Sequence, residues 1–230
     1  MSTGPTRVTY PLDLGAARVE LLPEKAVWWP EARTLFVADV HLGKAASFRA
    51  HGLPVPEGTT GETLDALSAL LGAHAAARLV FLGDFLHGPE SHHPAVLAAL
   101  RDWRICHAGV AMTLVRGNHD RRAGDPPAAL AIDLADEPLA LGPLAACHHP
   151  EAAPRAAPGA TALAGHWHPV VHLHARGRDG LRLPCFVHQP GRLVLPAFGA
   201  FTGGQRVAAA PGTRCYAVGA GRVWALPEEG

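Results

Sequence analysis

Five short polar clusters in this sequence follow apolar runs, and their side chains could hold metal ions. The clusters are Asp39-Val40-His41, Gly83-Asp84, Gly117-Asn118-His119-Asp120, His148-His149 and Gly165-His166-Trp167-His168. They supply carboxylates, a neutral amide oxygen and several imidazoles, which are ligands that hard to borderline divalent ions accept. None of the candidate ligands is a cysteine, which disfavours a structural zinc–thiolate site.

This set of ligands is large enough for two divalent ions that share one carboxylate. Two ions about 3.5–4 Å apart can activate a water molecule and stabilise the attacking and leaving oxygens of a phosphoryl displacement. His119 adds an imidazole that can titrate near neutral pH. The clusters therefore predict hydrolysis of a phosphate ester, provided that the fold brings them together.

Three apolar, β-prone runs are predicted to position the first clusters. The runs cover 34–38, 78–82 and 110–115, and each leads into a cluster. Such continuous apolar runs are typical of strands buried on both faces. Helices are predicted between them, over 59–77 and from Ser91 to about His107. The alternation indicates a mostly parallel α/β sheet, with ligands gathered outside the carboxyl ends of its strands.

The second half of the chain is predicted to be mainly β. Prolines and glycines cut it into short segments, and strands are expected at 139–141, 144–147, 161–164, 170–174, 181–188, 192–195, 214–218 and 223–226. Two further short strands are expected at 17–22 and 26–29, after a loose lead-in over 1–12. No repeat or low-complexity linker divides the chain. We expect one domain, 1–230, in which a second sheet packs on the first.

Composition limits the function less than the clusters do. The chain has 230 residues, of which 48% are hydrophobic, enough for a full core without disulfides. Lys+Arg and Asp+Glu each number 20, so any polyanion must be held by local groups. The four cysteines are widely spaced and the chain starts without a basic and apolar leader, which indicates a reduced, cytoplasmic protein. No uncharged apolar run approaches the roughly 20 residues that span a bilayer.

Taken in order, the five clusters resemble the five blocks of the calcineurin-like metallophosphoesterase superfamily. A closer resemblance, to the bacterial ligase-associated DNA damage response metallophosphoesterases, is carried by residues 37–49, 55–60, 116–121, 183–186 and 195–204. The resemblance implies an α/β fold, a four-layer αββα sandwich of two mixed β-sheets. It also implies a manganese-dependent phosphodiesterase that acts as an endonuclease in DNA repair and prefers single-stranded DNA. Functional partners implied are a DNA ligase, a helicase-related protein and an exonuclease-like protein.

The resemblance also assigns roles to individual residues. One metal ion would be bound by Asp39, His41, Asp84 and His168. The other ion would be bound by Asp84, Asn118, His148 and His166, so that Asp84 is shared. His119, backed by Asp120, would stabilise the phosphate or protonate the leaving oxygen. Either His148 or His149 could be the ligand of the fourth block, and His148 is favoured because the family usually has an acidic residue at the following position.

Side chains next to the clusters are candidates for substrate binding. The cationic candidates are Lys44, Arg49, Arg116, Arg121 and Arg122, because phosphates would run past them. Each arginine could equally be a solvated or ion-paired surface charge. Trp167 could stack on a base or simply pack. His92 and His93, at a predicted helix start, are expected to be capping and solvent-facing residues.

Two alternatives to a DNA endonuclease remain open. The same chemistry could act on RNA or on small or cyclic nucleotide diesters, because the metal ligands contact only phosphate. The fold could also be a catalytically dead scaffold for protein docking. That second alternative requires missing ligands, and this chain has a complete set.

Overall fold

The computed structural model describes residues 7–50, 52, 58–174, 180–200, 202–207 and 211–227. Residues 55–57 and Phe201, which belong to segments that carry the resemblance, lie outside the described residues. So do both ends of the predicted domain.

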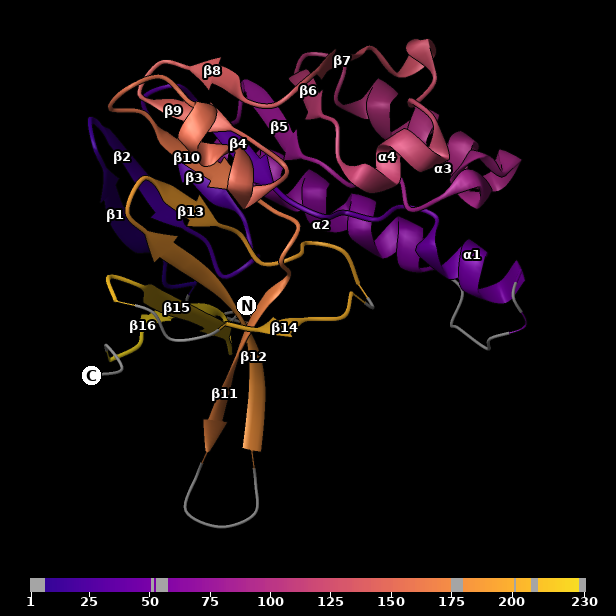
Figure 1. The fold of residues 1–230 in the computed structure, drawn as a ribbon. Helices are drawn as coiled ribbons and strands as arrows, with labels where there is room; N and C mark the ends of the chain where they lie inside the picture. The colour runs from indigo at the N-terminus through magenta and orange to yellow at the C-terminus, as the bar shows by residue number, and fades with distance from the viewer. Residues whose placement is uncertain are drawn as a thin grey trace, which may run out of the picture.

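The first sheet contains seven strands in the order β1-β2-β3-β4-β5-β6-β7 (Figure 1). They are β1 (Tyr10–Leu14), β2 (Ala17–Leu21), β3 (Val27–Trp29), β4 (Thr34–Val37), β5 (Arg78–Leu82), β6 (Ala111–Val115) and β7 (Ile132–Ala135). The strands from β1 to β4 pair antiparallel, whereas those from β4 to β7 pair parallel. The three predicted buried parallel strands are confirmed. The predicted loose lead-in is wrong from Tyr10 onward, because β1 pairs along its whole length with β2.

Helices cover one face of this sheet. The α-helices are α1 (Lys44–Ala50), α2 (Thr59–His74), α3 (Pro94–Cys106) and α4 (Asn118–Ala123), and the 3₁₀-helices are η1 (Pro89–His92) and η2 (Ala128–Leu130). A further 3₁₀-helix, η3 (Pro150–Arg155), packs on the second sheet instead. Leu67 and Leu70 of α2 and Leu100 of α3 are buried in one cluster with Leu79 and Phe81 of β5. The predicted amphipathic helix thus packs its leucines on the sheet, as its spacing indicated.

The start of α3 differs in part from the prediction. His93 is exposed and is the N-cap, because its Nδ1 atom accepts a hydrogen bond of 3.4 Å from the backbone N–H of Ala95. This confirms the predicted capping role. His92 lies in η1 and is partly buried, so the expectation that it faces solvent is wrong.

The second sheet has nine strands and is also mixed. They are β8 (Leu139–Leu141), β9 (Leu144–Ala146), β10 (Thr161–Ala164), β11 (Pro169–His174), β12 (Gly180–Gln189), β13 (Arg192–Val194), β14 (Gln205–Arg206), β15 (Arg214–Gly219) and β16 (Arg222–Ala225). Strand β10 runs parallel to β9 and β13. Strands β11 and β12 form a long antiparallel hairpin that extends away from the body (Figure 1).

The two sheets pack face to face. Phe36 of β4 and Val80 of β5 share a fully buried cluster with Leu163 of β10 and Phe186 of β12. On the other face of β10, Ala162 and Ala164 pack against Ala152 of η3. Alternate residues of β10 therefore face opposite layers, as the two-residue period of a strand requires.

The layers are helices, sheet, sheet and η3, which confirms the predicted αββα sandwich. The outermost layer over the second sheet is short. Among the described residues, no helix combines the length and apolarity needed to cross a membrane.

Candidate metal centre

Three of the polar clusters lie at one edge of the first sheet. The parallel register pairs Val37 with Phe81 and Leu82 with Val115, so β4, β5 and β6 end side by side. Asp39 follows β4, Asp84 follows β5, and Asn118 begins α4 just after β6. The carboxyl ends of these parallel strands thus bring three polar segments together, although they are distant in sequence.

The second sheet brings two clusters to the same place. His148 follows β9 and His166 follows β10, and these strands are parallel neighbours. The backbone N–H of His166 donates a 3.0 Å hydrogen bond to Oδ2 of Asp39. The edges of the two sheets therefore meet at the candidate centre.

One group of ligand atoms surrounds His41. Its Nε2 atom lies 3.3 Å from Nε2 of His168 and 3.9 Å from Oδ2 of Asp84. Nε2 of His168 in turn lies 3.4 Å from Oδ1 of Asp39. All four residues that were predicted to bind one ion therefore lie together.

A second group surrounds His148. Its Nε2 atom lies 3.0 Å from Oδ1 of Asn118, 3.1 Å from Nδ1 of His166 and 3.5 Å from Oδ1 of Asp84. Asp84 thus turns one oxygen toward each group, so it is the carboxylate that two ions could share. The structure brings all seven predicted ligand residues together, in the two groups predicted.

The charges of these residues fit divalent cations. Asp39 and Asp84 are buried, and no Lys or Arg of the described chain lies within 4.0 Å of either carboxylate, so burying their negative charges is costly unless a cation binds. Burial lowers the pKa of His148 to about 4 and also strongly lowers the pKa of His41. Both imidazoles are therefore neutral at pH 7 and have a lone pair for a metal ion.

The backbone at the centre is unusual. Asp39, His41, Asp84, His166 and His168 all have positive φ, between 47° and 69°. Residues other than glycine rarely adopt this left-handed region, and such strain clusters at functional sites. Five of the seven candidate ligands are held in this conformation, which turns their side chains toward a common centre.

Two glycines permit the close approach of these ligands. A Cβ atom on Gly117 would overlap Oδ1 of Asp84, and a Cβ atom on Gly83 would overlap the ring of His148. The absence of a side chain at Gly83 and Gly117 therefore leaves room for a ligand that comes from another segment.

The two adjacent histidines have different surroundings. The ring of His148 is fully buried in the second ligand group, whereas Nδ1 of His149 lies 2.8 Å from Oε1 of Glu137. Oε2 of Glu137 accepts hydrogen bonds of 2.8 Å from the backbone N–H groups of both histidines. This arrangement favours His148 as the ligand. It also gives Glu137, which the sequence did not single out, a role in holding the segment.

The carboxylate of Asp120 bonds to backbone N–H groups and not to the ring of His119. Its Oδ1 atom accepts a hydrogen bond of 2.9 Å from the backbone N–H of Leu86, and its Oδ2 atom accepts one of 2.9 Å from that of Gly117. The ring of His119 instead bonds through its Nδ1 atom to the backbone oxygen of His87, at 2.6 Å. The predicted pairing of His119 with Asp120 is wrong, because Asp120 points back to close the first turn of α4. Burial raises the pKa of Asp120 to about 6.

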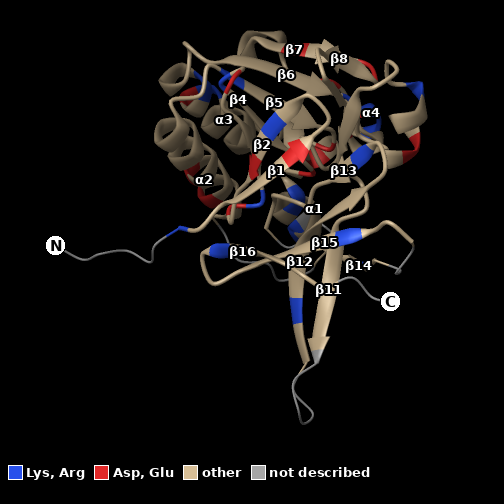
Figure 2. Ribbon diagram, turned by 90° about the vertical axis from the view of Figure 1, so that its left-hand side faces the viewer, with Lys and Arg blue, Asp and Glu red and all other residues tan. Residues whose placement is uncertain are grey.

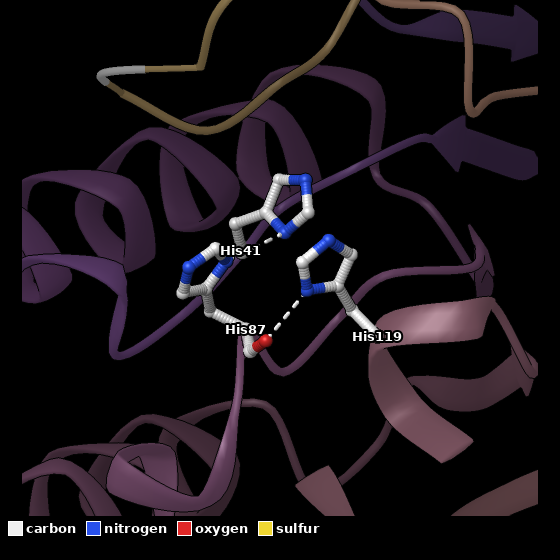
Figure 3. A group of neighbouring side chains, drawn as sticks. All are labelled: His41, His87 and His119. Atoms are coloured by element: carbon white, nitrogen blue, oxygen red, sulfur yellow. Dashed lines mark hydrogen bonds between the residues drawn. The ribbon is translucent and has the colours of Figure 1, made fainter. Parts of the chain in front are cut away.

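His87 is a part of the centre that the sequence analysis missed. Its Nδ1 atom lies 3.3 Å from Nδ1 of His41, and its ring stacks on that of His119 with 4.8 Å between centroids (Figure 3). The nitrogens of His41, His87 and His119 form a third close group. The only sequence signal was the position of His87 in the loop that follows Asp84.

The predicted substrate-binding cations differ in their surroundings. Lys44, at the start of α1, is half-buried near the centre, where burial lowers its pKa against the opposing effect of Asp39 and Asp84. Arg49 and Arg122 are exposed. Lys44 is thus the predicted cation that both candidate carboxylates attract.

Two further arginines already have carboxylate partners. The guanidinium of Arg116 makes hydrogen bonds of 2.8 and 3.0 Å to the carboxylate of Asp125. A nitrogen of Arg121 lies 3.5 Å from Oδ1 of Asp136. These ion pairs partly neutralise the positive charge that a phosphate would meet.

Trp167 is held by neighbouring residues. Its Nε1–H donates a 3.1 Å hydrogen bond to Oε1 of Glu151, and the guanidinium of Arg192 lies 4.9 Å from its ring. It also packs against a buried cluster formed by Cys185, Val187 and Val194. These contacts favour packing over base stacking, the two roles that the sequence left open.

Comparisons with known proteins identify the family of the chain. Residues 32–170 match the sequence model of the calcineurin-like phosphoesterase family. The crystal structure of the Pseudomonas putida nuclease MPE is similar over 95% of this chain and 100% of that chain, with 44% identity and a TM-score of 0.82. The E. coli phosphoesterase Yfce matches at 18% identity, over 81% of this chain and 88% of its own, with a TM-score of 0.38.

None of the curated proteins compared with the chain matches it. The family match nevertheless covers more than half of the chain, and the similarity to the P. putida nuclease covers nearly all of it. The chain belongs to the calcineurin-like phosphoesterase family and is a metal-dependent phosphoesterase.

Proposed function

We propose that this protein is a two-metal phosphodiesterase that cuts DNA internally, with manganese as its metal and single-stranded DNA as its preferred substrate. The observation that carries the proposal is the position of Asp84, whose two oxygens face two separate groups of ligands. The 44% identity to a protein described as a nuclease supports a nucleic acid as the substrate, and DNA is the nucleic acid that the resemblance implies.

Each of the two groups of candidate ligands would bind one ion. One ion would be held by Asp39, His41, Asp84 and His168. The other would be held by Asp84, Asn118, His148 and His166. When bound, such ions supply an activated water and stabilise the attacking and leaving oxygens of the phosphate. The oxygen and nitrogen ligands, with no thiolate, suit manganese.

His119 would act on the phosphate or the leaving group. Its backbone N–H donates a 2.9 Å hydrogen bond to Oδ1 of Asp84, and its Nδ1–H donates to the backbone oxygen of His87. With the Nδ1–H directed to a carbonyl, Nε2 is the other ring nitrogen. When the ring carries a second proton there, this N–H can donate to a phosphate oxygen or pass the proton to the leaving oxygen.

We further propose one domain over 1–230, a cytoplasmic location and a role in DNA repair beside a DNA ligase, a helicase-related protein and an exonuclease-like protein. The two sheets share one buried cluster, which supports a single domain. None of the four cysteines forms a disulfide, which supports a reducing compartment. The repair role rests on the resemblance alone.

The second candidate is hydrolysis of RNA or of a small or cyclic nucleotide diester. The pairing of Arg116 and Arg121 with aspartates favours the small diester, because fewer unpaired cations remain for a long polyanion such as DNA or RNA. A dead scaffold is disfavoured because the complete set of ligands converges.

Initial rates on four substrates with manganese test this choice. The substrates are a single-stranded DNA oligonucleotide, the same sequence as a duplex, its RNA equivalent and bis-p-nitrophenyl phosphate. The highest kcat/KM is expected for single-stranded DNA. A higher value for RNA or for the small diester would favour the second candidate, and no turnover of any substrate would favour the scaffold.

A further inference from the structure

A cavity of about 250 Å³ lies next to the candidate metal centre, at the base of the β11–β12 hairpin. His168 lines this cavity, and its Nε2 atom also faces Asp39 and His41 in the centre. Its described lining residues include Lys25 and Arg182 but neither Asp nor Glu. The cavity is therefore cationic and directly adjoins the place proposed for the scissile phosphate.

Lys25 is a cation without an acidic partner. Its ammonium nitrogen donates a 2.6 Å hydrogen bond to the backbone oxygen of Phe198, and no carboxylate of the described chain lies within salt-bridge distance. Burial lowers its pKa to about 8, so the amine is still mainly protonated at pH 7. A partly buried ammonium group without a counter-charge favours the binding of an anion beside it.

The segment that Lys25 contacts also supports the metal centre. The backbone N–H of Phe198 donates to the oxygen of Ala38 at 2.8 Å, and that of Gly199 donates to the oxygen of Asp39 at 3.2 Å. Lys25 is thus connected through one short segment to the backbone of a candidate ligand. An anion beside Lys25 would lie close to a phosphate at the centre.

Arg182 supplies a second cation. One of its terminal nitrogens donates a 2.9 Å hydrogen bond to the backbone oxygen of Gly204, the only hydrogen bond of this side chain within the described chain. A guanidinium has five N–H donors, so most remain available to phosphate oxygens. A Cβ atom on Gly204 would overlap this guanidinium, so the glycine allows its position.

The part of the described chain that supplies most of the cavity wall contains basic residues but no acidic ones. Between Ala152 and Pro227, the described residues include no Asp or Glu, but they include Arg155, Arg182, Arg192, Arg206, Arg214 and Arg222. In Figure 2, β12, β15 and β16 carry blue, and neither these strands nor β11 and β14 carry red. A neutral chain thus has one region that attracts polyanions.

We propose that this cavity binds a second phosphodiester group of the substrate strand, next to the scissile phosphate, through Lys25 and Arg182. The proposal rests on the proposed function. The cavity would favour a polynucleotide over a small diester, because only the polynucleotide has a neighbouring phosphate to place there. Val170 and Pro184 give the cavity an apolar wall on which the intervening sugar can pack.

The test compares two substrates, oligothymidylate and bis-p-nitrophenyl phosphate, which has no second phosphate. The variants are Arg182→Gln and Lys25→Gln. The matched control is Arg101→Gln, because Arg101 is exposed on α3 and lines no part of the cavity. Arg182 is exposed, so its variant is expected to fold even if Lys25→Gln does not; thermal melts check both.

Each cavity variant is expected to lower kcat/KM for oligothymidylate about tenfold more than kcat/KM for the small diester. The dependence of oligothymidylate binding on salt should also weaken, by about 0.7 in the slope of log K against log salt for each phosphate that the variant no longer binds. The Arg101→Gln control should keep the wild-type ratio between the two substrates.

Equal losses on both substrates, or no loss on either, would overturn the inference while leaving the proposed function intact. Wild-type protein that hydrolyses the small diester but leaves oligothymidylate uncut would instead overturn the proposed function, and the inference with it. The wild-type rates therefore distinguish the two failures.

Discussion

The Nδ1 atom of His41 lies 3.3 Å from the Nδ1 atom of His87. Because Nε2 of His41 faces the candidate ligands, its other nitrogen is free to donate to His87, which would fix the tautomer and the orientation of the ring. Partners of this kind commonly orient metal-bound histidines. The backbone oxygen of His87 also holds His119. One residue thus connects a candidate ligand with the candidate acid.

Replacing His87 should therefore weaken the centre without unfolding the protein. We expect His87→Ala to lower manganese affinity or the cleavage rate about 10–100-fold. His87→Gln, which keeps a hydrogen-bond acceptor, should recover part of the loss. Calorimetric titration of manganese and initial cleavage rates measure these effects. Wild-type affinity and rate in a folded His87→Ala variant would show that the contact has no role.

Replacing His119 should affect chemistry more than metal binding. His119→Ala is expected to retain manganese affinity and to slow cleavage, least for bis-p-nitrophenyl phosphate, whose leaving group needs no proton. The comparison requires kcat on that ester and on an unactivated dinucleotide. An equal loss on both substrates would argue against an acid role and leave phosphate stabilisation.

Asp120 is expected to contribute to stability. In Asp120→Asn, the amide can accept from only one of the two backbone N–H groups, of Leu86 and Gly117, that the carboxylate now satisfies. Leaving one buried donor unpaired costs about 1–3 kcal/mol. Urea unfolding at pH 8 measures the change, with exposed Asp136→Asn as a matched control. Unchanged stability with lost activity would restore a direct catalytic role.

The metal-free protein should lose stability in acid through His148. Burial lowers the pKa of this imidazole to about 4, below its usual 6.5, so the unfolded chain binds the proton first. Its contribution is fully present above pH 6.5 and is lost as the pH falls toward 4, by about 3 kcal/mol in total.

Other groups oppose this effect, since burial raises the pKa of Asp120 to about 6 and that of Asp84 as well. The comparison is therefore with His148→Gln. Urea unfolding in EDTA at several pH values should show a steeper loss for wild type. Parallel curves for the two proteins would contradict the buried, neutral state of His148.

Much of the fold could be predicted because its strongest signals are local. The runs at β4, β5 and β6 are apolar on both faces, and their β-prone residues make a buried parallel strand the natural interpretation. By contrast, β7 has the sequence Ile-Asp-Leu-Ala and lies at the sheet edge, where partial exposure removes the apolar signal. Helix α4 was missed because its six residues are mostly polar.

The candidate centre could also be predicted in part from the sequence. Ligands that follow strands could be found, since strand ends mark them in the sequence. His87 and Glu137 could not, because their roles depend on contacts between distant loops. The partner of His119 was misassigned because adjacency in sequence favoured Asp120, whereas the direction of the α4 turn decides which atoms meet.

The central claim is tested most directly with circular single-stranded DNA and manganese. A circle has no end, so only an internal cut converts it to linear fragments. We expect wild type to produce linear fragments and Asn118→Ala, folded by circular dichroism, to leave the circle intact, because Asn118 would bind one of the two ions. An intact circle with wild type, alongside rapid hydrolysis of bis-p-nitrophenyl phosphate, would contradict the account.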